Sequence, residues 1–167
     1  NTTVWLKCGG YLVIEKTEEL ISIDVNTGKN IGIHNLEETV LQTNLDAAKE
    51  IAIQLRLRNL SGIIIIDFID MKLEEDKELL IKTLGEALEK DRIKNNIVHF
   101  TDLGLIEMTR KRVGNPLSND FLEVCKECGG LGHVKSKTTL LSNIFKEIKL
   151  AVEDKDIRKL LLYLSED

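Results

Sequence analysis

The sequence has few aromatic residues, three cysteines and no long apolar run, and each scarcity excludes a class of protein. Aromatic side chains make up 4% of the 167 residues, too few to bind nucleic acid mainly by stacking bases on rings. The longest apolar run covers residues 160–164, far short of the roughly 20 residues of a membrane helix. The odd cysteine count argues against a disulfide framework and favours a reducing cytoplasm.

An excess of positive charge is also missing. Lys and Arg number 23 against 28 Asp and Glu, a net charge of -5, which argues against a surface that attracts nucleic acid everywhere but leaves room for a local basic site. Apolar residues make up 43% and charged residues 31%, as in folded globular proteins. The chain begins at Asn1 without a basic stretch followed by an apolar one, so we expect no secretory signal.

The hydrophobic pattern predicts an α/β protein in which strands and helices alternate. The strand at 63–66 is an unbroken run of isoleucine, typical of a strand covered on both faces. Asn35 and Glu38 form a capping box before the first helix. The expected elements are a hairpin of strands 11–15 and 20–25, a helix at 36–58, a strand at 63–66, a helix at 74–92, a strand at 96–100 and an edge strand at 104–113.

The only proline, Pro116, lies in the segment 114–119, which has the composition of a domain boundary. Two further helices are expected beyond the cysteines, at 140–152 and 156–164.

Two aspartates end apolar strands. Asp24 follows Ile23 and Asp67 follows Ile66, and ligands of open α/β sheets collect at the carboxyl ends of strands. Paired carboxylates suit Mg²⁺, which takes one or two of them and completes its shell with water and phosphate. Asn26 could orient a water or a phosphate oxygen there. The alternative is that the three residues only end strands and begin turns.

Cys125 and Cys128 have the spacing of a metal knuckle, followed by small residues that let backbone amides turn toward sulfur. Structural zinc needs four ligands. A zinc knuckle would place the fourth at position 138, which is Thr138. We therefore expect a zinc site shared by two chains, with His133 as the rival ligand and two unbound thiols as the other alternative. Cys8 has the surroundings of a buried small residue.

Basic residues form three short clusters, which could surround the acidic pair and bind phosphates or simply form a solvated face. They are Arg56 with Arg58, Arg92 with Lys94, and Arg110, Lys111 and Arg112.

Several of these motifs occur together in one known family. The segments are 9–15, 17–18, 23–28, 36–39, 43–48, 54–58 and 66–71, followed by 107–112 and the cysteine element 125–132. Together they resemble the catalytic half of the RNase E/G family of bacterial endoribonucleases, over roughly residues 4–135.

The resemblance implies a DNase I-like subdomain at 1–118 with a mixed sheet and flanking helices, a zinc-link at 119–135, and the start of a small helical dimerisation domain at 136–167. It implies that Asp24 and Asp67 bind a catalytic Mg²⁺, that Asn26 assists, and that Lys94 helps to engage the RNA end. Arg110, Lys111 and Arg112 would add phosphate contacts.

By the same likeness, Cys125 and Cys128 would share one Zn²⁺ with a second subunit, giving a homodimer or higher homo-oligomer. The expected function is Mg²⁺-dependent cleavage of single-stranded RNA that leaves a 5′ phosphate, by a fragment of a longer enzyme whose own activity would be weak or absent. The alternative is a non-catalytic module for zinc-mediated dimerisation or RNA binding.

Overall fold

The chain separates into two compact units, Asn1–Leu122 and Glu123–Asp167. The computed structural model describes residues 2–28, 36–101 and 103–153, together with residues 159, 161 and 163. Asn35 of the expected capping box, and six of the nine residues of the expected helix at 156–164, lie outside these residues. The three-part division at residues 118 and 135 stays a prediction.

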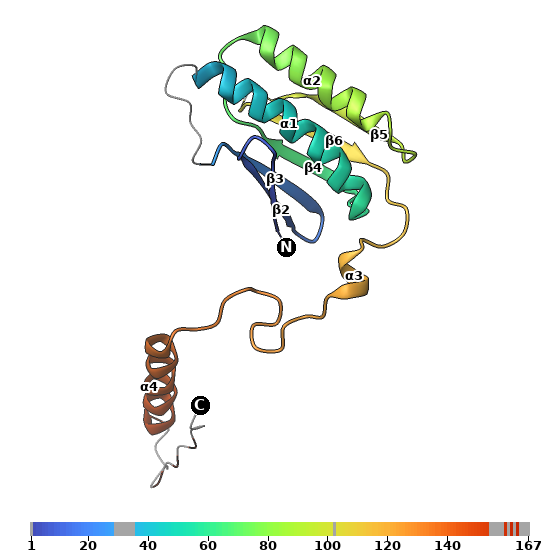
Figure 1. Cartoon of the computed structure of the whole chain (residues 1–167). Helices are drawn as coiled ribbons and strands as arrows, with labels where there is room; N and C mark the ends of the chain where they lie inside the picture. The colour runs from blue at the N-terminus through green and yellow to red at the C-terminus, as the bar shows by residue number, and fades with distance from the viewer. Residues whose placement is uncertain are drawn as a thin grey trace. The chain divides into compact units, whose positions relative to one another are not determined.

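The described part of the first unit forms a six-stranded mixed sheet in the order β1-β2-β3-β4-β6-β5 (Figure 1). Neighbouring strands are antiparallel except β3 and β4, which run parallel. The predicted hairpin is confirmed as β2 and β3. The strands are β1 (Thr3–Trp5), β2 (Tyr11–Lys16), β3 (Leu20–Asn26), β4 (Gly62–Asp67), β5 (Asn95–Phe100) and β6 (Leu105–Arg110).

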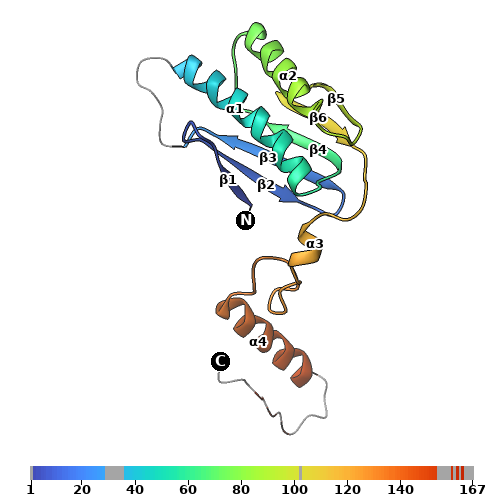
Figure 2. The same ribbon diagram turned by 45° about the vertical axis from the view of Figure 1, so that its right-hand side comes forward.

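Two long helices cover one face of this sheet. Helix α1 (Leu36–Leu57) connects β3 to β4, and α2 (Glu74–Leu88) follows β4. They lie side by side on the same face (Figures 1 and 2). Their buried side chains, including Ile51, Leu80 and Leu84, form one core with alternate residues of the strands. The helix predicted at 74–92 ends earlier, at Leu88, where the chain turns toward β5.

Within the first unit, the described residues leave the opposite face of the sheet uncovered. Ile64 and Ile66 of β4 are fully buried under the helices, but Ile63 on the other face is 52% exposed and Ile65 is half-buried. The prediction that both faces of this strand are covered is therefore wrong. Because residues 63–66 are all isoleucine, the sequence pattern could not show which of them point to the core.

A second difference concerns the last strand. The segment 104–113 was expected at the sheet edge, but β6 lies between β4 and β5, and β5 is the edge strand. Ile106 and Met108 of β6 are buried against the helices. Alternation of apolar and polar residues predicts a strand with one buried face, but it does not give the strand's place in the sheet.

The second unit contains the cysteine knuckle and α4 (Lys137–Glu153), the helix expected at 140–152. The four-residue helix α3 (Ser118–Phe121) ends the first unit.

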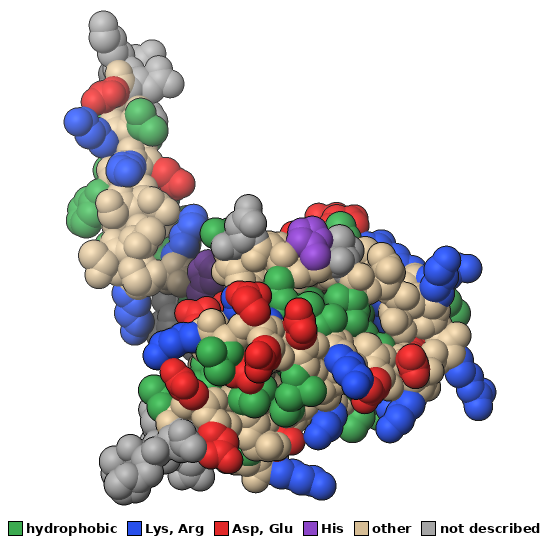
Figure 3. Space-filling view, turned by 90° about the horizontal axis from the view of Figure 1, so that it is seen from above, with side chains coloured by type: hydrophobic (Ala, Val, Ile, Leu, Met, Phe, Trp, Pro, Cys, Tyr) green, Lys and Arg blue, Asp and Glu red, His purple; other side chains and the backbone are tan. Residues whose placement is uncertain are grey.

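None of the described helices is both long enough and apolar enough to cross a membrane. On the face seen in Figure 3, acidic side chains gather among apolar ones, so positive charge does not cover this side.

Candidate functional site

The acidic pair predicted from the sequence comes together at one end of the sheet. Asp24 and Asp67 are register partners in the parallel strands β3 and β4, whose backbones are about 4.8 Å apart. The neighbouring residues Ile23 and Ile66 point into the core, so both aspartates point to the open face, where both are exposed. This arrangement places two carboxylates within reach of a single cation.

Asn26 lies on the same face, two residues beyond Asp24. Its side-chain Nδ2 donates a hydrogen bond to Oδ2 of Asp24 at 2.7 Å. The amide therefore fixes one carboxylate oxygen of the pair, and the role of Asn26 in catalysis stays a prediction.

The two carboxylates repel each other. Partial burial, followed by the negative charges of Asp24 and Asp70, raises the pKa of Asp67 above its usual range. A divalent cation would relieve this repulsion. The described residues contain no cluster of three or more His, Cys, Asp or Glu side chains that could hold a metal by themselves. A two-carboxylate set suits Mg²⁺, which keeps several waters and takes substrate phosphate, better than an ion that needs a full protein cage.

Glycine residues let the turn before β2 pack closely against the end of β3. A Cβ atom on Gly10 would lie 2.6 Å from the carbonyl oxygen of Asn26, and one on Gly28 would lie 2.3 Å from that of Gly9. Gly28 also has a φ of +68°, which L-residues with side chains rarely adopt. The backbone that carries Asn26 is therefore held by close packing.

The expected basic residues gather at the opposite end of the sheet from the acidic pair. Lys94, Lys111 and Arg112 line a shallow groove of about 470 Å³. Arg110 pairs with Gly62 at the start of β4, and Gly62 and Asp67 are about 16 Å apart at about 3.3 Å per residue. Of the two interpretations of the basic clusters, the one in which these cations surround the acidic pair is therefore wrong, because β6 runs antiparallel to β4 and ends far from Asp67.

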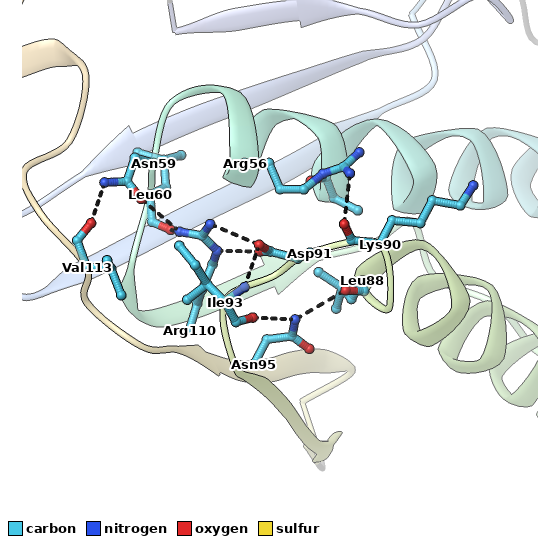
Figure 4. A network of polar contacts seen from close by, with 11 residues as sticks. Arg56, Asn59, Leu60, Leu88, Lys90, Asp91, Ile93, Asn95, Arg110 and Val113 are labelled. Carbon is cyan, nitrogen blue, oxygen red and sulfur yellow. Dashed lines mark hydrogen bonds and ion pairs between the residues drawn. The ribbon is translucent and has the colours of Figure 1, made fainter.

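Arg110 is not exposed in this groove. Its side chain is 2% exposed and forms an ion pair with Asp91, whose side chain is 4% exposed, at 2.6 Å (Figure 4). It also donates to the carbonyl oxygen of Leu60 and to the side chain of Asn59. These contacts remove Arg110 from the candidate RNA ligands and make it part of the core.

The exposed basic residues differ in their contacts. Arg112 forms an exposed ion pair with Glu19 at 2.9 Å. The backbone N–H of Lys111 donates to the carbonyl oxygen of Lys94 at 2.9 Å, which places these two residues side by side. Arg56 donates to the carbonyl oxygen of Lys90 and so helps to hold the turn after α2 (Figure 4).

The knuckle in the second unit presents two thiols. Cys125 is exposed, Cys128 is half-buried, and neither forms a disulfide. The backbone N–H of Gly132 donates to Sγ of Cys128 at 3.3 Å, as expected from the small residues that follow it. Hydrogen bonds from the amides of Gly132 and Gly130 lower the pKa of the Cys128 thiol, which favours the thiolate that zinc binds. His133 is exposed nearby in the sequence, and the half-buried Cys8 packs against the core of the first unit.

Two polar residues that support this architecture were missed. Asp91 is the buried partner of Arg110, and Asn44 of α1 binds the backbone just beyond Asp67. The side-chain partner of Asp91 is 19 residues away, and the backbone that Asn44 binds is 25 residues away, so no local pattern could reveal these contacts. The sequence did contain one sign of such a role for Asn44, because Asn44 is a polar residue on the apolar face of a predicted helix.

Comparison with known proteins places this site in context. Residues 1–113 match the model described as "Ribonuclease E/G family". The ribonuclease G of Haemophilus influenzae is 51% identical over 143 residues, which cover 86% of this chain and 29% of that protein. The ribonuclease G of Escherichia coli K12 is 44% identical over 162 residues, 97% of this chain and 33% of that protein.

A ribonuclease E is similar as well. The protein from Synechocystis is 51% identical over 129 residues, which cover 77% of this chain and 19% of that protein. The chain thus spans no more than about a third of the length of these relatives.

Proposed function

Because the chain belongs to the ribonuclease E/G family, we propose that its first unit carries the metal-dependent cleavage centre of an endoribonuclease that acts on single-stranded RNA. The observation that carries this proposal is the register pairing of Asp24 with Asp67 on the open face of the sheet. It favours a nuclease over a zinc-mediated dimerisation or RNA-binding module, in which these two carboxylates would have no reason to lie together. The DNase I-like character of the unit is part of the proposal.

The residues at this end of the sheet have distinct roles. Asp24 and Asp67 would hold Mg²⁺ through one carboxylate each, and Asn26 fixes the orientation of Asp24 through its hydrogen bond. When bound, the ion would supply positive charge that stabilises the scissile phosphate and lowers the pKa of water at the site. In-line attack by water on the phosphorus would form a new P–O bond and break the bond to the 3′ oxygen, which takes up a proton, giving a 3′ hydroxyl and a 5′ phosphate. The open face gives a strand of RNA access to both carboxylates.

Metal binding by the chain itself tests this proposal. We expect Mn²⁺, used as a spectroscopic substitute for Mg²⁺, to bind and to broaden NMR signals near Asp24 and Asp67. The Asp24→Asn variant keeps the shape of the side chain but removes its charge, so Mn²⁺ affinity should fall at least tenfold.

The matched control is Asp46→Asn, which removes the same charge from α1, where Asp46 accepts a hydrogen bond from Gln42. It should bind Mn²⁺ as the unmodified chain does. Equal Mn²⁺ affinity in the Asp24→Asn chain would rule out this metal site.

We also propose that Lys94, Lys111 and Arg112 bind RNA phosphates at the other end of the sheet. Their shared groove supports this role. A strand of RNA that contacts both ends of the sheet would span about 16 Å along β4, so these cations would hold RNA away from the bond that is cleaved.

The cytoplasm, where thiols stay reduced, suits this chemistry and the unpaired Cys125 and Cys128.

For the second unit we propose a zinc site shared by two copies of the chain in a homodimer or higher oligomer. Each copy would contribute Cys125 and Cys128, giving the four sulfur ligands of a tetrahedral site. The amide of Gly132 that points at Cys128 supports thiolate binding.

Metal analysis combined with analytical ultracentrifugation tests the shared site. We expect one zinc per two chains, and Cys125→Ser should remove the zinc and weaken association because metal binding and assembly are linked. Cys8→Ser is the matched control and should change neither. One zinc per chain in protein that stays monomeric would contradict sharing and would favour His133 as a ligand.

A further inference from the structure

Asn44 is a fully buried asparagine in the interior of α1, with an exposed fraction of 0%. Its Nδ2 donates a hydrogen bond to the carbonyl oxygen of Ile69 at 2.8 Å. Its Oδ1 accepts a hydrogen bond from the backbone N–H of the same residue at 3.1 Å. One side chain thus satisfies both backbone polar groups of Ile69, as a neighbouring strand would.

Ile69 lies two residues after Asp67, just beyond the end of β4. Between them, the side chain of Phe68 is 4% exposed and belongs to the core. The segment that leaves Asp67 is therefore held at residue 68 by apolar packing and at residue 69 by Asn44. β3 and β6 also pair with Asp67 on its two sides, so the backbone there is held by both neighbouring strands.

An asparagine is an unfavourable choice for a buried helix position. Leucine has a side chain of the same branched shape and a better helix propensity, and it would occupy this position without burying a polar group. Asn44 is useful at this position because of what it binds, namely the backbone next to one member of the acidic pair.

We propose that Asn44 is a positioning residue for the metal site: by holding the backbone of Ile69, it keeps the Asp67 carboxylate beside that of Asp24. This inference rests on the proposed metal site. It assigns α1 a role beyond core packing, because the helix connects β3 to β4 and also fixes the end of β4.

The test compares metal affinity with stability in the full chain. Asn44→Leu keeps the branched shape of the side chain but removes both hydrogen bonds, so Mn²⁺ affinity should fall about tenfold or more, as is typical when the support of a metal ligand is lost. Asn95→Leu is the matched control. Asn95 also binds backbone, donating to the carbonyl oxygens of Leu88 and Ile93, but it pairs with Arg110 at the far end of the sheet.

Both substitutions should lower the melting temperature, and only Asn44→Leu should lower Mn²⁺ affinity. A folded Asn44→Leu chain that binds Mn²⁺ as tightly as the unmodified chain overturns the inference while leaving the metal site intact. An unmodified chain that binds no Mn²⁺ overturns the metal site and the inference with it.

If Asn44→Leu does not fold, the unmodified chain carries the test. Saturating Mg²⁺ should slow hydrogen exchange at the Ile69 amide, because the ion and the Asn44 contact stabilise the same conformation. Unchanged exchange at Ile69 in the Mg²⁺-bound chain overturns the inference.

Discussion

Replacing Asp67 with asparagine should slow RNA cleavage by about two to four orders of magnitude. The substitution keeps the shape of the side chain but removes one of the two charges that would hold Mg²⁺. Charge stabilisation by a metal is worth several kcal/mol in the transition state, and each 1.4 kcal/mol or so is a factor of ten in rate. The measurement is single-turnover cleavage by a chimera in which this chain replaces the matching segment of the Escherichia coli ribonuclease G.

The same variant should not destabilise the metal-free chain. Partial burial and the charges of Asp24 and Asp70 raise the pKa of Asp67, so its ionised form opposes folding above the pKa of the unfolded chain, and asparagine removes that repulsion. Loss of cleavage together with unchanged or increased thermal stability would identify a functional carboxylate. Asp46→Asn is the control for charge, and cleavage by the Asp67→Asn chimera at the rate of the unmodified chimera would refute the assignment.

Replacing Asp91 with leucine should lower the free energy of unfolding by about 3 to 5 kcal/mol, because it leaves the charge of Arg110 buried without its partner. The guanidinium donates two hydrogen bonds to Asp91 (Figure 4). The double variant Asp91→Leu/Arg110→Leu should recover much of this loss, since an apolar pair of similar volume often replaces a buried ion pair at little cost. Urea unfolding of the single and double variants measures the coupling.

The stabilisation that the Asp91–Arg110 pair provides depends on pH and decreases in acid. Burial alone would raise the pKa of Asp91, but hydrogen bonds from Arg110 and the Ile93 amide, with the charge of Arg110, outweigh it and lower the pKa. The stabilisation is therefore present above the unfolded value of about 3.9 and is lost as the pH falls through the lower folded value. The exposed pair Glu19–Arg112 is the control, because Glu19→Gln should change stability by less than about 1 kcal/mol. An Asp91→Leu loss no larger than that of Glu19→Gln would contradict the prediction.

The acidic pair could be predicted because the features that indicate it are local in the sequence. Asp24 and Asp67 each end an apolar strand segment, and the helical pattern between the segments implies a crossover, which parallel neighbours require. The register that puts them opposite each other was supported by the family resemblance rather than by any pattern in the residues.

The basic cluster could not be interpreted in this way. Arg110, Lys111 and Arg112 are consecutive and looked equivalent, but Arg110 is the last residue of β6 and points into the core, whereas Lys111 and Arg112 follow the strand and are exposed. The partners that make burial possible, Asp91 and Asn59, are 19 and 51 residues away in the sequence. Burial of a charge depends on such distant partners, and a single sequence does not reveal them.

The parallel pairing of β3 with β4 makes chain length as important to the acidic pair as residue identity. Successive side chains in a strand point to opposite faces, so adding or deleting one residue within either strand would turn its aspartate toward α1 and α2. We therefore expect this part of the chain to accept many single substitutions on its open face, but no single-residue insertion or deletion in 20–24 or 62–67. Such a change would remove Mn²⁺ binding even though both aspartates remained.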